Sequence, residues 1–290
     1  MGVIMGRRES RVRMTGLGRI LGAVLTYAAL TIFTIYAIWP ILWTVLSSFK
    51  DRVDIISTPP VLFFRPTFDN YRKIFFTFPD FGHFVVNTIV TSTASTSIVM
   101  VLALLAAYGV TRFRFWWRKG LLLGVLVHRM IPEVSLAIPF FLLAKSIGLY
   151  DSRLAVILGM VAFTSPFALW LLMGFVEKVP VEVEESAQVE GCTHVGAFWH
   201  ITVPLMLPGV LVTFIFCFIF EWNMFLLPLI LTSSNAMTLA PLVVKLSTEY
   251  GVEWGPMTAI ATIIFVPLLV LGATIQRYLV SGLTMGAVKG

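Results

Sequence analysis

Charged residues are scarce in this chain, and their scarcity excludes an ordinary soluble enzyme. Only 12% of the 290 residues are charged and 58% are apolar, whereas a typical soluble domain carries roughly 25% charged residues. The mean hydropathy is +0.91, so the apolar side chains exceed what one water-facing globule can bury. Lipid is therefore the expected solvent for much of the chain.

Sequence motifs for several kinds of chemistry are also missing. No Walker A motif occurs, so the chain has no P-loop for ATP. No H-E-x-x-H pair and no G-x-S-x-G turn is present, which leaves hydrolase chemistry without support. The two cysteines, Cys192 and Cys217, are too few for a disulfide framework or a four-thiolate zinc site. We expect no catalytic residue, metal or cofactor in this chain.

Six apolar runs are long enough to cross a bilayer, which takes roughly 20 helical residues. Four runs contain no charged side chain: residues 20–46, 84–111, 154–176 and 254–276. Two others, residues 120–144 and 209–231, contain polar groups inside the run. The predicted fold is an all-α integral membrane protein with six transmembrane helices. It divides into a basic arm (1–19), a six-span domain (20–276) and a tail (277–290).

The basic residues indicate how these spans are oriented. Basic side chains outnumber acidic ones by 21 to 15, but they lie in the gaps between apolar runs and form no stripe, so nucleic acid is not an expected partner. Basic residues dominate the arm (1–19) and the gap after the second run (112–119). Positive charge favours the cytoplasmic side, so a cell-membrane protein with both termini in the cytoplasm is predicted.

The gap between the first two runs contains an amphipathic pattern. After Thr67, four apolar side chains fall on one face of a short helix: Phe68, Tyr71, Ile74 and Phe75. This pattern predicts a helix lying on the outer membrane surface.

The gap at residues 177–208 is acidic, although acid does not help membrane orientation. Pro180 suits the first helical position and the following glutamates suit the first turns, which predicts a helix over residues 181–190. Gly191 suits a left-handed stop, and a second helix is predicted from His194 until Pro204 breaks it. The gap is either a solvated connection or a surface that another protein contacts.

Residues in this gap resemble a family signature. Glu185, Ser186 and Ala187, followed by Gly191, Ile201 and Pro204, match the spacing of the E-A-A-x3-G-x9-I-x-L-P signature, with Ser186 and Val203 as mild replacements. The chain therefore resembles the permease subunits of binding-protein-dependent ABC importers of type I. Its ending, residues 282–290, is similar to that of the second permease subunit of maltose-type transporters, in the carbohydrate-uptake branch.

That resemblance implies a set of partners and contact residues. The helix at 181–190 would be a coupling helix in a cleft of an ATPase subunit, with Glu185 paired to a basic residue there. The partners would be a second permease subunit, two ATPase subunits that hold ATP and Mg, and an external solute-binding protein. The implied ATPase contacts are Glu185, Ser186, Ala187, Glu190, Gly191, Ile201 and Pro204, with Thr284, Gly286 and Lys289 in the tail. Substitutions of Glu182 and Glu184 are predicted to be much milder than those of Glu185.

Polar residues within the spans are candidates for a solute path. Arg129 and Glu133 are four residues apart, so on one helix they could pair, either as a path wall or as a buried structural pair. Glu221, Trp222 and Asn223 suit a sugar, although Trp222 equally suits the interfacial aromatic belt. The hydroxyl-rich run at residues 88–97 is more typical of close helix packing.

Two other functions compete with the importer subunit. An ion-coupled secondary transporter could relay protons through His128, Arg129, Glu133 and Glu221. A membrane scaffold would leave these intramembrane charges unexplained. The acidic gap favours the importer subunit, because a self-contained carrier has no evident need for it.

Overall fold

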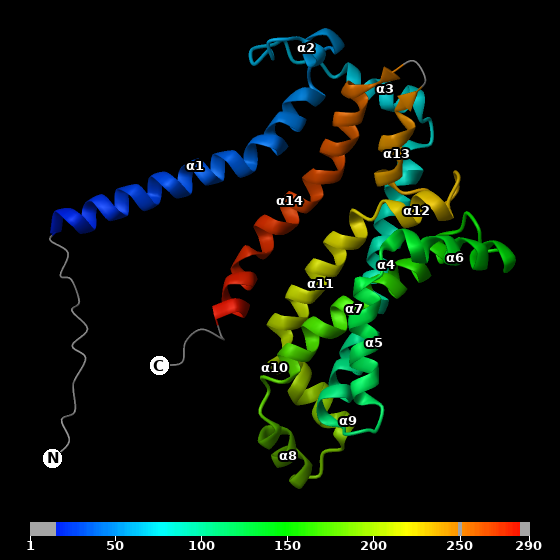
Figure 1. Cartoon of the computed structure of the whole chain (residues 1–290). Coiled ribbons are helices and arrows are strands. Elements are labelled where there is room, and N and C mark those ends of the chain that lie inside the picture. Colours follow the sequence, from blue (N-terminus) through cyan, green and yellow to red (C-terminus); the bar gives the residue numbers. More distant parts are fainter. Residues whose placement is uncertain (1–15, 249–250, 285–290) are drawn as a thin grey trace, which may run out of the picture.

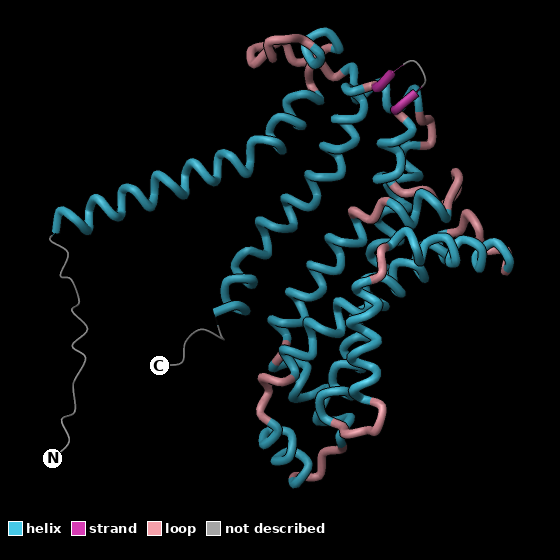
Figure 2. The backbone as a smooth tube through the Cα atoms, viewed as in Figure 1, coloured by secondary structure: helices cyan, strands magenta, loops and turns pink. Residues whose placement is uncertain are grey.

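The computed structural model describes residues 16–248 and 251–284, which are almost entirely helical (Figures 1 and 2). The four long helices are α1 (Gly16–Ser48), α4 (Phe81–Arg112), α7 (Arg153–Val176) and α14 (Trp254–Thr284). The others are α2 (Arg52–Ile56), α3 (Asp69–Thr77), α5 (Arg118–Met130), α6 (Glu133–Ser146), α8 (Val181–Val189), α9 (His194–Ala197), π-helical η1 (Phe198–Thr202), α10 (Val203–Leu205), α11 (Leu207–Trp222), α12 (Leu226–Leu231) and α13 (Leu239–Lys245). Two short strands, β1 (Ser247–Thr248) and β2 (Gly251–Val252), pair antiparallel.

Four predicted spans are confirmed as continuous apolar helices: Ile20–Ser48, Phe81–Arg112, Arg153–Val176 and Trp254–Ala273. The two runs predicted as spans with polar groups inside them, residues 120–144 and 209–231, are not continuous helices. α5 and α6 meet at 99°, because Ile131 before Pro132 is extended and Pro132 cannot continue the helix. α11 ends at Trp222, and a bend of 76° separates it from the helical segment His194–Leu205. Counting each bent pair as one span gives six.

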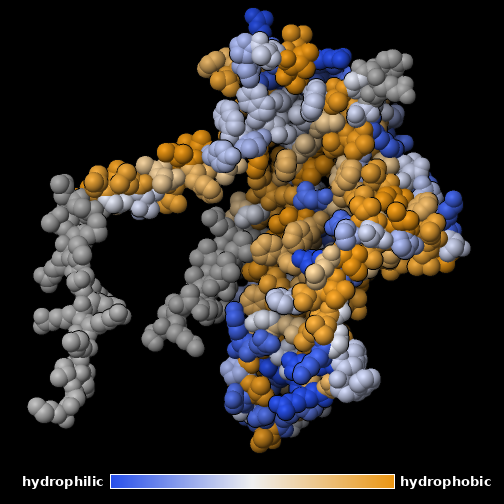
Figure 3. All heavy atoms as spheres, viewed as in Figure 1, coloured by the Kyte–Doolittle hydropathy of each residue, from blue (hydrophilic) through white to orange (hydrophobic). Residues whose placement is uncertain are grey.

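The centre of the bundle is the packing of α4 on α7 and α11. α4 presents a buried stripe of hydroxyl side chains, which lets helices approach closely: Thr88, Thr91, Ser92, Ser95 and Thr96. The packing interpretation of this run is therefore confirmed. Figure 3 shows an apolar middle between two more hydrophilic ends, one around α2 and α3 and one around α8 and α9. We call these the α3 end and the α8 end.

The predicted helix after Thr67 is confirmed as α3, and part of its apolar face packs inside the protein. Ile74 is fully buried, and α3 packs on α14. Phe68 and Phe75 remain exposed. Asn70 is also buried, and its amide donates to the carbonyls of Ser48 (2.9 Å) and Lys50 (2.8 Å), which ties α3 to the end of α1.

We expect Gly255→Ala to destabilise the α3 end. A Cβ at Gly255 would lie 2.1 Å from Oδ1 of Asn70, and two buried hydrogen bonds hold that amide in place. Overpacking of this kind typically costs about 1 to 3 kcal/mol. Gly272→Ala is the matched control on the same helix, since a Cβ there meets nothing within 4 Å. Thermal unfolding in detergent should separate the two variants, and equal melting temperatures would contradict the account of this contact.

Candidate functional site

The helix α8 and the turn after it form the acidic segment at the α8 end. α8 spans Val181–Val189, which confirms the predicted helix to within one residue, with Pro180 at the N-cap. Gly191 has φ +97, as predicted for a left-handed stop. The amide of Gly191 donates to Gln188 O and that of Cys192 to Ala187 O, both at 3.0 Å, which is the Schellman pattern of a helix C-terminus. Backbone hydrogen bonds thus fix the turn that ends α8.

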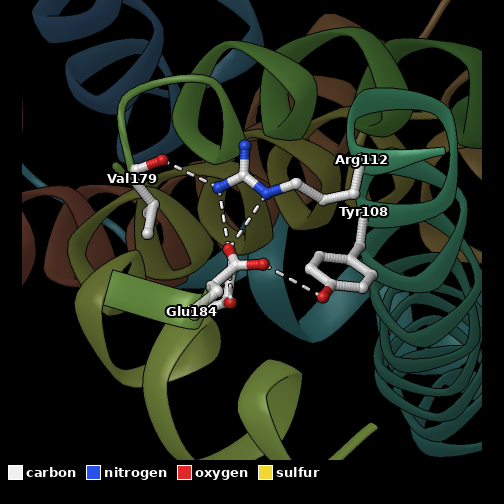
Figure 4. Close-up of polar contacts among 5 residues, drawn as sticks. Tyr108, Arg112, Val179 and Glu184 are labelled. Carbon is white, nitrogen blue, oxygen red and sulfur yellow. Dashed lines mark hydrogen bonds and ion pairs between the residues drawn. The ribbon is translucent and has the colours of Figure 1, made fainter. Parts of the chain in front are cut away.

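Glu184 anchors α8 to the membrane-spanning bundle (Figure 4). Its Oε1 accepts from Arg112 Nη2 (2.8 Å) and Nε (3.0 Å) and from Thr202 Oγ1 (2.9 Å). Its Oε2 accepts from the hydroxyl of Tyr108 at 3.1 Å. The Glu184 side chain is 3% exposed and that of Arg112 is 10% exposed. The prediction that a Glu184 substitution is mild was therefore wrong, since this carboxylate is a buried ion-pair partner.

Arg112 also holds the segment that precedes α8. Its Nη2 also donates to the carbonyl of Val179 at 2.7 Å, so one guanidinium holds both the approach to α8 and α8 itself. On the other side, Phe198 is buried and its ring lies 4.7 Å from that of Tyr108. Both segments that flank the Gly191 turn are therefore fixed to the end of α4.

The opposite face of α8 is exposed and acidic. Glu182, Glu185, Ser186 and Glu190 are exposed, and Val189 is 90% exposed. Glu185 has no hydrogen bond or ion pair from its side chain within the described residues. The anchored helix thus presents to solvent carboxylates that form no ion pair within the described residues, together with three exposed valines, Val181, Val183 and Val189.

The second helix of this segment differs from its prediction. α9 starts at His194, as predicted, where Thr193 Oγ1 caps it by accepting from Gly196 N at 3.1 Å. The helix then widens into η1 and continues past Pro204 to Leu205. A π-helical turn accommodates Pro204, which has no N–H to donate. Ile201 is half-buried and Pro204 is exposed.

A cavity of about 510 Å³ lies where α5, α6, α7, α11 and α12 converge. Arg129, Glu133 and Asn223 are its long polar side chains, and four phenylalanine rings line it: Phe163, Phe167, Phe220 and Phe225. Arg129 and Glu133 form no ion pair in the described structure. The prediction that they share one helix was wrong, because the chain bends between them. The Arg129 guanidinium instead lies 5.1 Å from the centre of the Phe167 ring.

Glu221 and Trp222 are buried beside this cavity and do not line it. Glu221 Oε2 accepts from Ser95 Oγ (2.6 Å) and Thr96 Oγ1, while its Oε1 is buried without a partner in the described structure. Trp222 is 6% exposed and donates to Ile264 O on α14 at 3.1 Å. Trp222 is therefore a packing residue, and neither the path nor the interfacial belt describes it.

At the α3 end, Asp151 joins two connections that are far apart in sequence. Asp151 has φ 57, and its carboxylate accepts from the backbone amides of residues 233–236 over 3.0 to 3.3 Å. Partial burial alone would raise the pKa of Asp151, but the four backbone donors outweigh it and hold the pKa below its ordinary value. Sequence analysis missed this contact, because nothing in the sequence pairs Asp151 with a stretch of amides.

We expect the Asp151 contact to stabilise the fold near neutral pH and to fail in acid. Because the folded-state pKa is depressed, the stabilisation is fully present above the ordinary aspartate pKa of about 3.9 and is lost as the pH falls through the folded value. The difference in melting temperature between parent and Asp151→Asn should therefore shrink below about pH 3.9. Asp80→Asn, at an exposed position, is the control. A pH-independent difference would show that charge is not the cause.

Comparison with known proteins decides the family. Residues 99–285 match the model of the binding-protein-dependent transport system inner membrane component. The chain belongs to this family. It is a multi-pass inner-membrane permease subunit, and the ion-coupled carrier is not supported.

Two permease subunits illustrate how far the similarity extends. The trehalose transport system permease protein SugB of Mycobacterium tuberculosis is 35% identical over 258 residues, 88% of this chain and 93% of that protein. The diacetylchitobiose uptake system permease protein DasC of Streptomyces coelicolor is 32% identical over 278 residues, 93% and 99% of the two chains. Both relatives are named as permease proteins of uptake systems.

A solved structure shows the same fold. A chain of a bacterial ABC transporter involved in the import of the acidic polysaccharide alginate superposes on this permease with a TM-score of 0.72. The two chains are 20% identical, and the match covers 91% of this chain and 98% of that one. The predicted type I permease fold is therefore confirmed.

Proposed function

We propose that this permease is one half of the membrane pathway of an ATP-driven importer for a sugar or sugar-derived solute. The names of its relatives, which specify trehalose and diacetylchitobiose, support the solute class. The cavity supports it too, since phenylalanine rings provide apolar walls while Arg129, Glu133 and Asn223 offer hydrogen bonds. We place these three residues on the path and Glu221 behind it.

The proposal rests on the difference in burial between two adjacent glutamates. Glu184 is buried in an ion pair with Arg112, whereas Glu185 is exposed and unpaired in the described structure. A purely connecting loop has no need for such an anchor. We propose that α8 is a coupling helix whose exposed face docks on an ATPase subunit, which binds ATP and Mg.

The proposed docking surface contains more residues than Glu185. It comprises Glu185, Ser186, Ala187, Glu190 and Gly191 of α8 and its turn, with Ile201 and Pro204 setting the return to α11. Thr284 ends α14, and Gly286 and Lys289 lie outside the described residues. We propose these three as tail contacts with the ATPase pair.

The remaining partners follow from the same proposal. A second permease subunit completes the pathway, two ATPase subunits bind on the cytoplasmic side, and an external solute-binding protein delivers the solute. The α8 end then faces the cytoplasm with both termini, in agreement with the basic residues at 112–119.

Uptake of a labelled solute by cells carrying the complete system tests the function. The ligand of the binding protein that co-purifies with the permease should identify the sugar. Depleting ATP should abolish uptake, while a protonophore should leave it intact for as long as ATP is maintained. Uptake that follows the proton gradient and ignores ATP would contradict the proposal.

A further inference from the structure

The connection between α4 and α5 concentrates positive charge. Residues 112–119, here called the basic loop, contain four basic side chains and no acidic one: Arg112, Arg114, Arg118 and Lys119. Arg112 is occupied by Glu184. The other three form no ion pair within the described part of the chain, and Arg114 and Lys119 are exposed. The positive charges of Arg114, Arg118 and Lys119 are therefore available to an anion from outside the chain.

The basic loop lies where the apolar surface of two helices ends. Leu105 on α4 and Leu123 on α5 are 49% and 61% exposed, as expected for side chains that face lipid. Between them Trp116 is 95% exposed and Trp117 is 50% exposed. Exposed tryptophans beside basic residues are typical of the level of lipid headgroups. The ring of Phe113 packs against Tyr108 and His194, which holds the loop in place.

The N-terminus of α5 also lacks a negative charge. Its first turn contains no acidic residue, and no side chain caps it. Arg118 and Lys119 instead place positive charge at the positive end of the helix dipole, which is unfavourable unless an anion lies nearby. The Nε atom of Arg118 is buried and lacks a hydrogen-bond partner within the described structure.

We propose that the basic loop binds the phosphate of an anionic phospholipid in the leaflet on the α8 side. Arg114, Arg118 and Lys119 supply the charge, while Trp116 inserts among the headgroups. A soluble anion would account for the charges, but it would not account for an almost fully exposed tryptophan at the edge of the apolar surface. Because Arg112 begins this loop and holds Glu184, a bound lipid would also steady the anchor of α8.

Quenching of tryptophan fluorescence by brominated lipids in nanodiscs tests the site on the full-length chain. The part of the quenching that Trp116→Phe removes reports on the basic loop. We expect brominated phosphatidylglycerol to quench it at lower lipid fractions than brominated phosphatidylcholine does. Arg114→Gln and Lys119→Gln should each reduce that preference about fivefold, the equivalent of about 1 kcal/mol per basic residue. Arg65→Gln, an exposed arginine at the α3 end, should not change it.

Three results would overturn the inference. Equal quenching by the two lipids would show that charge does not select the lipid. Displacement by millimolar inorganic phosphate or glycerol phosphate would indicate a site for free anions. Loss of the preference in the complex with the ATPase subunits would assign the loop to a protein partner. Retention of the preference in all three comparisons supports the lipid site.

Discussion

We expect Glu184→Gln to destabilise the α8 end and to lower the amount of assembled transporter sharply. The substitution leaves the guanidinium of Arg112 buried without its carboxylate, since the two side chains are 3% and 10% exposed. Removing one partner of a buried ion pair typically costs about 3 to 5 kcal/mol. Limited proteolysis of residues 177–208 and the yield of folded chain in detergent measure the effect.

The matched control is Glu221→Gln, at the other buried glutamate. Glu221 is bonded to hydroxyl groups and has no basic partner in the described structure, so a neutral amide leaves no opposite charge unpaired. We expect its effect to be much smaller than that of Glu184→Gln. Arg112→Met with Glu184→Leu should recover part of the loss, because replacing both members of a buried pair is far less harmful than removing one. A Glu184→Gln chain as stable as the parent would refute the anchor.

We expect Glu185→Gln to leave the fold unchanged and to abolish the coupling of ATP hydrolysis to uptake. Glu185 is exposed and contacts nothing else in the described structure through its carboxylate, so stability has little to lose. In the proposed complex the same carboxylate would be desolvated against a basic residue. Losing it would then cost about 3 to 5 kcal/mol, more than a hundredfold in affinity for the ATPase subunit. Co-purification of the ATPase subunit and ATP-dependent uptake are the measurements.

Other acidic positions serve as controls for Glu185. Glu177→Gln, an exposed position before α8, should behave like the parent. Glu182 lies three residues before Glu185 and is also exposed, so the two lie on nearly the same face. This placement corrects the prediction that a Glu182 substitution is much milder, and we expect an intermediate effect there. Gly191→Ala should uncouple without removing charge, since φ +97 disfavours any Cβ. If Glu185→Gln, Glu182→Gln and Gly191→Ala all behaved like the parent, the segment would be only a linker.

Local signals in the sequence were sufficient for much of the fold. Long runs without charge located α1, α4, α7 and α14, and Pro180 and Gly191 bounded α8 nearly to the residue. The bent spans were harder to predict, because hydropathy does not indicate where a helix changes direction. Pro132 could have indicated the break between α5 and α6, since a proline there ends a helix.

The site was only half predictable for a different reason. Glu184 and Glu185 are adjacent, similar in chemistry and equally compatible with the first turns of a helix. Which of them is buried depends on Arg112, 72 residues earlier in the chain, and on where α4 ends relative to α8. Periodicity within α8 cannot supply that information. Trp222 shows the same limit, because its partner is a carbonyl on α14.

Site-specific photo-crosslinking from Ser186 tests the central claim most directly. Ser186 is exposed on the same helix as Glu185, and its hydroxyl donates to Glu182 O within α8. A photoreactive residue at this position, activated in native membranes, should yield an adduct that mass spectrometry identifies as an ATPase subunit. The same residue at Phe63, exposed at the α3 end, should yield none with that subunit. Adducts from Ser186 that contain only lipid, or none at all while uptake stays active, would contradict a coupling role for α8.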